Sequence, residues 1–153
     1  MRIISSLVFF LILTVVGCSA SGPKPPSVTE LRVMLKSADT NEQRVATDWI
    51  QQLGPKAAEM VPDLIVALKS PDLGVRQGAA QALGRIGRPA AEAAVPALAA
   101  ALADSEYEGR RTAADALGQL GSAAASAIPE LEKLSKMPDP CGSGPSALKK
   151  IRP

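Results

Sequence analysis

From residue 28 onward, apolar residues recur at spacings of three and four, which is the pattern of helices that bury one face. The middle of the chain shows this pattern most clearly. Asp72 is a candidate helix N-cap, and Gly87, after the last apolar position, suits the left-handed turn that ends a helix. A second helix is predicted over 90–104, with Pro96 in its early turns, where a missing N–H costs least. The pattern therefore predicts a pair of helices packed antiparallel.

This pattern repeats along the chain at offsets of 33 and 34 residues. A first landmark lies near the start of each second helix, at Val61-Pro62-Asp63-Leu64, Val95-Pro96-Ala97-Leu98 and Ile128-Pro129-Glu130-Leu131, with a weaker copy at Val28-Thr29-Glu30-Leu31. A second landmark ends each first helix, at Ile50-Gln51-Gln52-Leu53-Gly54, Leu83-Gly84-Arg85-Ile86-Gly87 and Leu117-Gly118-Gln119-Leu120-Gly121. Because both landmarks keep the same offsets, the sequence predicts a repeat protein.

One pair of helices cannot bury both of its apolar faces, so the units must stack, and about three units are the minimum for stability. Full units are predicted at about 40–70, 72–104 and 106–136. A lone second helix over 28–36 is expected to cap the N-terminal end, and 146–151 resembles part of another first helix that caps the other end. The predicted fold is all-α, a short α-solenoid of three to four helical hairpins. We divide the chain into a signal peptide, 1–17, a tether, 18–27, a repeat domain, 28–136, and a degenerate C-terminal cap and tail, 137–153.

The middle repeat resembles a known family. Its residues read Asp72-Leu73-Gly74-Val75-Arg76-Gln77-Gly78-Ala79-Ala80-Gln81-Ala82-Leu83-Gly84-Arg85-Ile86-Gly87, followed by Ala94-Val95-Pro96-Ala97-Leu98. This run is similar to the short HEAT-like repeat, the compact type also found in phycobilisome bilin lyases. The resemblance covers roughly 28–136. Tetratricopeptide and ankyrin repeats have similar periods, but their signatures are absent from the sequence.

The N-terminal segment indicates that the protein is exported from the cytoplasm. Residues 1–17 combine a basic start with an apolar run of about 14 residues, which fits a signal peptide better than a membrane span of about 20. Its junction, Val15-Val16-Gly17-Cys18, resembles the bacterial lipobox, which implies cleavage after Gly17 and lipidation of Cys18 with long acyl chains such as palmitate. The alternative is cleavage after Ala20, which would leave a soluble secreted or periplasmic protein. By resemblance to other lipoproteins, Ser19 favours the periplasmic side of an outer membrane, where the cell has one.

Composition excludes several classes of function. The 153 residues contain no histidine, the commonest general base and metal ligand. The net charge of +2 lacks the basic excess of nucleic-acid-binding proteins. No phosphate-binding loop, nucleophile elbow or metal-ligand cluster is present in the sequence. We therefore expect no catalytic residues, cofactor, metal or nucleic-acid partner. We interpret Cys141, which lies in a Pro- and Gly-rich stretch, as an inert thiol, with pairing between chains as the alternative.

The charged residues of the repeats are interpreted as architectural. Arg76 lies four residues after Asp72, and Arg110 four residues after Glu106, which is the spacing of ion pairs within one helix. Trp49 stands where the later repeats have Ala82 and Ala116. It either packs against the lone helix at the N-terminal end or serves as a partly exposed binding anchor, and we favour packing. Equivalent alanines at Ala46, Ala79 and Ala113 predict close approach between helices.

The resemblance also implies a binding surface, because second helices line the concave, ligand-facing side of this family. Carried onto this sequence, that surface includes Arg32, Val33, Lys36, Asp63, Ile65, Val66, Lys69, Ala99, Ala100, Ala103, Glu132, Lys133 and Lys136. Its middle is rich in alanine and its ends are charged. Such a shallow apolar strip suits a helix or an extended segment of another protein.

These observations favour a non-enzymatic scaffold that is anchored in the bacterial cell envelope through lipid on Cys18 and binds another protein. One alternative is a self-assembling structural or regulatory protein, in which copies stack end to end or pair through Cys141. Another is an accessory of the bilin-lyase type. Export argues against that alternative, because bilin attachment takes place on cytoplasmic proteins.

Overall fold

The computed structural model describes residues 25–136 and 142–152. Within these ranges all regular structure is helical, which confirms the predicted all-α solenoid. The α-helices are α2 (Val28–Leu35), α3 (Thr40–Leu53), α4 (Val61–Ala67), α5 (Leu73–Ile86), α6 (Ala91–Ala101), α7 (Tyr107–Leu120), α8 (Ile128–Ser135) and α9 (Ser143–Ile151). Short 3₁₀ helices join first helices to second helices, at η1 (Gly54–Met60), η2 (Arg88–Ala90) and η3 (Gly121–Ala127).

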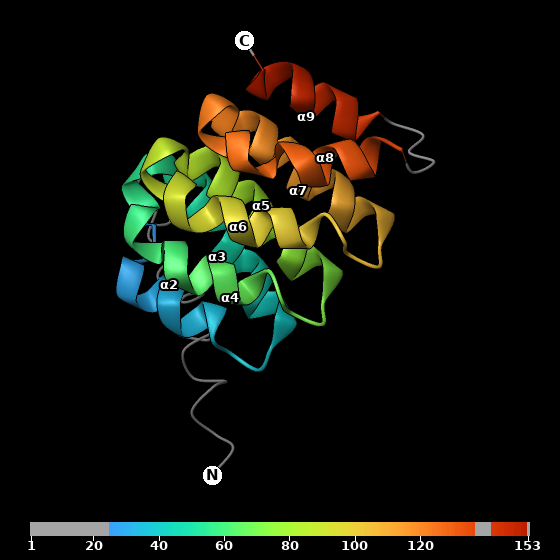
Figure 1. Cartoon of the computed structure of the whole chain (residues 1–153). Coiled ribbons are helices and arrows are strands. Elements are labelled where there is room, and N and C mark those ends of the chain that lie inside the picture. Colours follow the sequence, from blue (N-terminus) through green and yellow to red (C-terminus); the bar gives the residue numbers. More distant parts are fainter. Residues whose placement is uncertain (1–24, 137–141, 153) are drawn as a thin grey trace, which may run out of the picture.

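The helices form two layers along the stack (Figure 1). One layer contains the second helices α2, α4, α6 and α8, and the other contains the first helices α3, α5 and α7. The helix α9 covers the C-terminal end, where it packs on α7 and α8, as the degenerate first helix was expected to do. The lone second helix at the N-terminal end is α2, which packs on α3.

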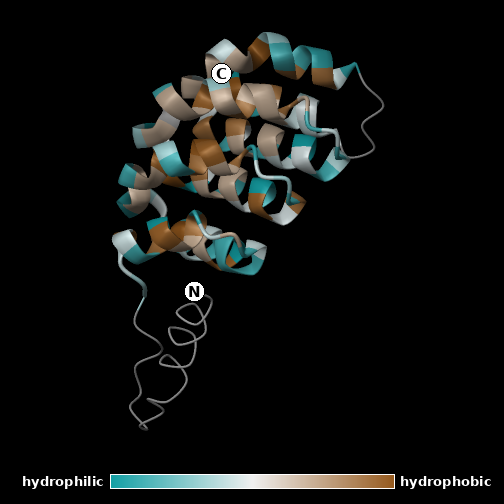
Figure 2. Ribbon diagram, turned by 90° about the horizontal axis from the view of Figure 1, so that it is seen from below, coloured by the Kyte–Doolittle hydropathy of each residue, from teal (hydrophilic) through white to brown (hydrophobic). Residues whose placement is uncertain are grey.

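A continuous apolar core lies between the layers. Its largest side chains come from every repeat and are almost completely shielded from solvent: Leu31, Ile50, Leu64, Leu83, Leu98, Leu117 and Leu131. Figure 2 shows hydrophobic residues along the inside of the stack and hydrophilic residues mainly at the turns. Because each unit adds its own leucine or isoleucine to one core, no unit buries its apolar faces alone.

The helix ends follow the predicted capping residues. Asp72 caps α5, where its side chain accepts a hydrogen bond from the Val75 N–H at 2.9 Å. Gly87 ends the same helix with a φ of 75°, and Gly121 ends α7 with a φ of 60°. The second helix of this repeat begins one turn earlier than its equivalents. Pro96 therefore lies inside α6 and not at its first positions.

Replacing Gly87 by alanine is expected to destabilise the fold by about 1 kcal/mol, because a Cβ is strained at positive φ. A Cβ built there meets no atom closer than 4.0 Å, so strain and not a clash is the cause. Urea unfolding measures the loss. Alanine at the exposed neighbour Arg88 is the control, and equal losses for both variants would contradict the explanation.

The turns between repeats share one pattern of hydrogen bonds. The side chains of Ser37, Ser70 and Asp104 occupy the same place in successive repeats, and each accepts from the backbone N–H two residues later. At a second shared place, the side chains of Gln43, Arg76 and Arg110 each donate to the carbonyl oxygen six residues earlier. These side chains satisfy backbone groups that the ends of the helices leave free.

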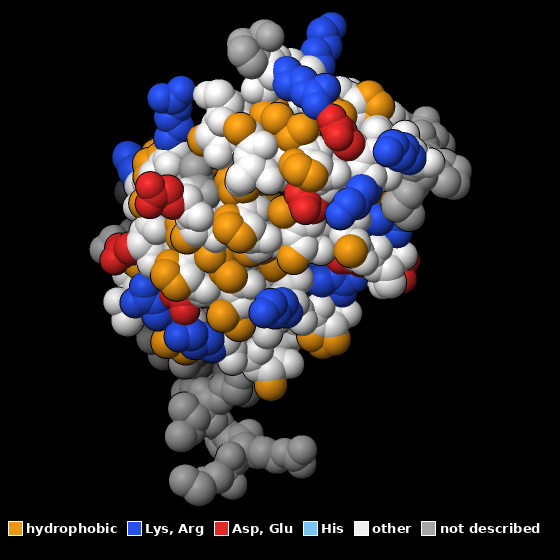
Figure 3. Space-filling view, viewed as in Figure 1, with side chains coloured by type: hydrophobic (Ala, Val, Ile, Leu, Met, Phe, Trp, Pro, Cys, Tyr) orange, Lys and Arg blue, Asp and Glu red, His pale blue; other side chains and the backbone are white. Residues whose placement is uncertain are grey.

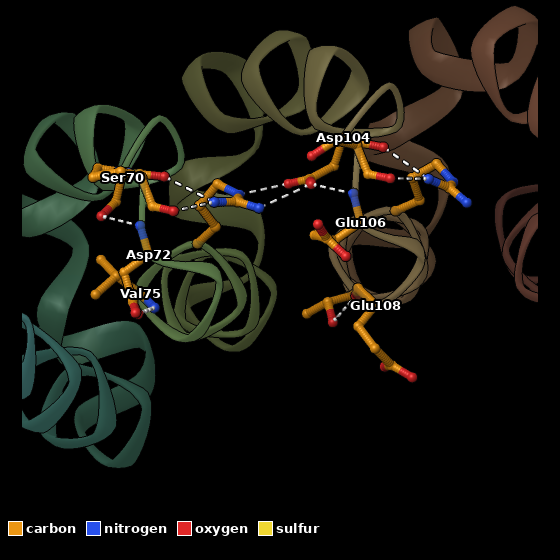
Figure 4. A network of polar contacts seen from close by, with 11 residues as sticks. Ser70, Asp72, Val75, Asp104, Glu106 and Glu108 are labelled. Atoms are coloured by element: carbon orange, nitrogen blue, oxygen red, sulfur yellow. Dashed lines mark hydrogen bonds and ion pairs between the residues drawn. The ribbon is translucent and has the colours of Figure 1, made fainter.

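The predicted ion pairs within single helices are wrong. Arg76 binds Asp104 of the next turn, with Nε–Oδ2 and Nη2–Oδ1 distances of 2.6 and 3.0 Å (Figure 4). Asp72 is paired instead with Arg44 of the preceding first helix, at 2.7 and 2.9 Å. Arg110 donates to backbone carbonyls at Asp104 and Ser105. Stacking therefore joins neighbouring repeats through carboxylates at the turns.

First helices approach one another closely at small residues. The equivalent alanines of α3, α5 and α7, which are Ala46, Ala79 and Ala113, are fully buried, as their spacing predicts. A Cβ added to Gly84 would lie 3.1 Å from the Cα of Ala116 on the next first helix. Trp49 fits at the position equivalent to Ala116 because, within the described residues, no first helix precedes α3 in the stack. It packs on the core, as the packing interpretation predicts, but is only half-buried, so its role as a binding anchor stays a prediction.

Candidate functional site

The exposed side of the second-helix layer carries a row of apolar side chains. Val33 of α2 and Val66 of α4 occupy equivalent places and are 67% and 70% exposed, unusually high for valine in a packed fold. Ala100 of α6 continues the row and is also exposed, and Lys133 of α8 ends it. We call Val33, Val66 and Ala100 the apolar strip. Figure 3 shows hydrophobic side chains gathered over the middle of this face, with charged groups around them.

A hollow of about 460 Å³ lies beside the strip, between α2 and α4. The side chains that line it include Leu35, Lys36, Asp63, Ile65, Val66 and Lys69. Five of these residues, Lys36, Asp63, Ile65, Val66 and Lys69, belong to the surface predicted from the sequence, and the fold brings them to one place. The hollow thus has an apolar wall and two lysines.

Asp63 holds two of the predicted cations. It accepts from Arg32 Nε at 2.8 Å and lies 3.0 Å from Lys36 Nζ. Burial opposes ionisation of Asp63, but the hydrogen bonds from these two cations outweigh it and lower the pKa of the carboxyl group. Arg32 and Lys36 therefore link α2 to α4, and they are less available to a partner than the sequence predicted.

The other predicted residues divide by exposure. Ile65 and Ala99 are half-buried and pack on the core, and Ile65 also lines the hollow. Glu132 is paired with Arg152, which follows α9. Apart from Val33 and Val66, the predicted residues that are exposed and not bound to Asp63 are Lys69, Ala100, Ala103, Lys133 and Lys136. Within the described ranges, none of these three lysines takes part in an ion pair.

A family model described as HEAT repeats matches residues 28–108, and a model described as the PBS lyase HEAT-like repeat matches residues 109–136. The chain belongs to the HEAT-repeat family. The matched ranges together equal the repeat domain predicted from the sequence. None of the curated proteins matches the sequence.

Solved structures share the HEAT-repeat fold of the chain. The complex of CpcE and CpcF of phycocyanin lyase from Nostoc sp. PCC7120 has a TM-score of 0.69 and 24% identity, over 90% of this chain and 58% of that chain. An engineered protein has a TM-score of 0.67 and 24% identity, over 81% of this chain and 60% of that chain. A second engineered protein has a TM-score of 0.69 and 21% identity, over 82% and 64%. The chain spans less than two thirds of each of these relatives.

The described part of this HEAT-repeat chain holds no group of three or more Cys, Asp or Glu residues that could bind a metal. No helix in the same part is long and apolar enough to cross a bilayer. A second, smaller hollow of about 260 Å³ lies on the first-helix side and is lined mainly by polar groups, among them Arg85, Arg111 and Asp115. Repeat spacing did not reveal it, because these residues come together only when α5 packs on α7.

The predicted lipidation site, Cys18, and the second cysteine, Cys141, lie outside the described residues. The same is true of the lipobox and of the tether up to residue 24. Lipidation, cleavage and the state of Cys141 therefore stay predictions from the sequence.

Proposed function

We propose that this HEAT-repeat protein is a scaffold that binds another envelope protein through its second-helix face. The observation that carries the proposal is the apolar strip, in which valines at one repeat position stand largely in solvent. Contiguous exposed apolar surface on a soluble domain is typical of binding sites. The core continues through every repeat and holds the strip on a rigid support.

We further propose that acyl chains on Cys18 hold the scaffold at a bacterial membrane. The support is the sequence Val15-Val16-Gly17-Cys18 after an apolar segment. Two or more acyl chains anchor stably, because each buried methylene contributes about 0.8 kcal/mol. Residues 18–27 would span at most about 35 Å when extended, so the repeats would stay close to the membrane surface.

A photo-crosslinking amino acid at Val66, in the full chain expressed at its natural level in its own cells, is expected to capture one envelope protein. The matched control places the same amino acid at Arg85, which is exposed on a first helix. Capture from position 66 alone, identified by mass spectrometry and reduced in a Cys18→Ala variant, is the expected result. Labelling with an alkyne analogue of palmitate tests the anchor directly, and the variant should lose the label.

Equal capture from positions 66 and 85 would contradict a specific face. Capture of further copies of this chain would instead favour the self-assembling alternative. If capture is unchanged in the Cys18→Ala variant, the lipid anchor is not needed for binding. The proposal would then keep the second-helix binding face and lose the membrane anchor.

A second copy of the chain cannot continue the stack in the same register, because the two ends do not fit each other. At the N-terminal end, Val45 and Trp49 stand where the next first helix has Gly78 and Ala82. At the C-terminal end, Lys149 occupies the place that Gly118 has in α7, because Ala147 of α9 meets Gly118 as Ala116 of α7 meets Gly84. Close packing of first helices needs small residues at these places, so end-to-end growth is not the function we propose. The similarity to the phycocyanin lyase complex supports the fold, and we carry no lyase activity over from it.

A further inference from the structure

We infer that the partner segment is an acidic amphipathic helix that lies across the second helices, with its apolar side on the strip and its carboxylates toward a row of lysines. This inference rests on the proposed function and adds the chemistry of the partner. It follows from three features of the second-helix face: the spacing of the strip, the charge beside it and the hollow between α2 and α4.

The strip has the spacing that a helix can match. Adjacent packed helices lie about 8 to 10 Å apart, so Val33, Val66 and Ala100 recur at roughly this distance along the stack. Seven residues of an α-helix span about 10.5 Å. A helix that runs along the stack therefore presents one side chain per heptad to each repeat. The strip is shallow, which suits an amphipathic helix face.

The residues just after the ends of the second helices carry charge of one sign, whereas the nearby carboxylates of Asp63 and Glu132 are held in ion pairs. Lys36, Lys69 and Lys136 occupy the same repeat position, just after the ends of α2, α4 and α8. Asp63 pairs with the first of them, but Lys69 and Lys136 make no ion pair with any other described residue. Lysine favours the dipole at a helix C-terminus, yet Ala103 at the end of α6 shows that the fold does not require it there.

The hollow places an apolar wall next to one of these lysines. Ile65 and Val66 of α4 line it together with Lys69, which lies just after that helix. An apolar side chain of the partner can enter the hollow while a neighbouring carboxylate binds the Lys69 ammonium. A basic segment would instead bring like charge against Lys69, Lys133 and Lys136, which is unfavourable.

The probes are three synthetic 21-residue helical peptides: one amphipathic with leucine and glutamate, one with lysine in place of every glutamate, and one with the first composition in shuffled order. Binding is measured by fluorescence anisotropy to the full chain in nanodiscs of phosphatidylcholine. We expect the acidic amphipathic peptide to bind at least about tenfold more tightly than either of the others.

The variants test whether the lysines beside the strip matter by their position, and not only through the net charge of the chain. Lys69→Glu with Lys136→Glu should weaken binding of the acidic peptide by about tenfold or more. Arg85→Glu with Lys149→Glu changes the net charge equally on exposed residues away from the strip, and should alter binding less than about twofold. Circular dichroism and the melting temperature are expected to stay unchanged in both pairs.

Two binding results overturn the inference. One is equal or tighter binding of the basic peptide. The other is that the chain binds no peptide but binds vesicles that contain phosphatidylglycerol, and that the Lys69→Glu, Lys136→Glu chain loses this binding. That result would assign the lysines to an anionic membrane surface. If Val66 crosslinking captures a partner equally well with and without the two lysines, the scaffold stands and the acidic segment is wrong. If Val66 captures no protein at all, the proposed function itself fails.

Discussion

Replacing Asp104 by alanine is expected to lower the free energy of unfolding by about 3 kcal/mol. The reason is that the largely buried guanidinium of Arg76 would lose its carboxylate partner. The side chains of Asp104 and Arg76 are 8% and 15% exposed. Asp104 also accepts from the Glu106 N–H at 2.9 Å at the start of α7, so this backbone group loses its partner as well. Urea unfolding followed by circular dichroism measures the loss.

An exposed ion pair provides the control for Asp104. Arg111 bridges Glu108 and Asp115 on the surface of α7, and its side chain is 38% exposed. Alanine at Arg111 should cost less than about 1 kcal/mol. The double variant Arg76→Ala, Asp104→Ala should be less destabilised than the sum of the single variants, because removing both partners leaves no unpaired charge. Additive losses would show that the two side chains act independently.

Acid should weaken the same contact. Hydrogen bonds from Arg76 hold the pKa of Asp104 below its usual value, so the carboxylate stabilises the folded chain more than the protonated acid does. The stabilisation is complete above the unfolded pKa of about 3.9 and is lost as the pH falls through the lower folded pKa. The stability difference between the natural chain and the Asp104→Ala variant should therefore shrink below about pH 4. A difference that is constant with pH would contradict this assignment.

Replacing Gly78 by alanine is expected to destabilise the chain by about 2 kcal/mol, although alanine is the better helix former. A Cβ at Gly78 would lie 2.7 Å from the Cβ of Thr47 and even nearer to its Oγ1, so α3 and α5 would have to move apart. Helix propensity alone predicts the opposite sign, a gain of about 1 kcal/mol. Thermal or urea unfolding decides between the two.

Two variants test the cause of the Gly78 effect. Gly118→Ala is the matched control in α7, because its Cβ would meet the flexible Lys150 side chain at 3.1 Å and Ala147 at 3.4 Å or more. It should be neutral or stabilising. In a Thr47→Gly background, Gly78→Ala should lose its cost, since the obstructing Cβ is gone. A cost that persists in that background would exclude the close approach of α3 and α5 as the reason.

Part of the candidate face could be predicted from repeat positions alone. Equivalent positions predicted that Val66 and Lys69 share one surface, and the structure places them in one hollow. The availability of each residue could not be predicted in this way. Arg32 is bound to Asp63, and Ile65 packs on the core. Such contacts depend on how α2 and α4 pack on their neighbours, and repeat positions do not contain this information.

The repeat period, the all-α fold and the helix ends at Asp72 and Gly87 all follow from the amino-acid sequence alone. Helical periodicity, N-cap carboxylates and left-handed glycines act within a few residues, so they can be read without knowledge of the fold. The partners of the charged side chains, in contrast, depend on how the repeats stack. Arg44 with Asp72 and Arg76 with Asp104 are each separated by 28 residues along the chain. Such pairs form when stacking brings a turn of one repeat against a helix of its neighbour, and this distance in space is not encoded in the spacing within either repeat.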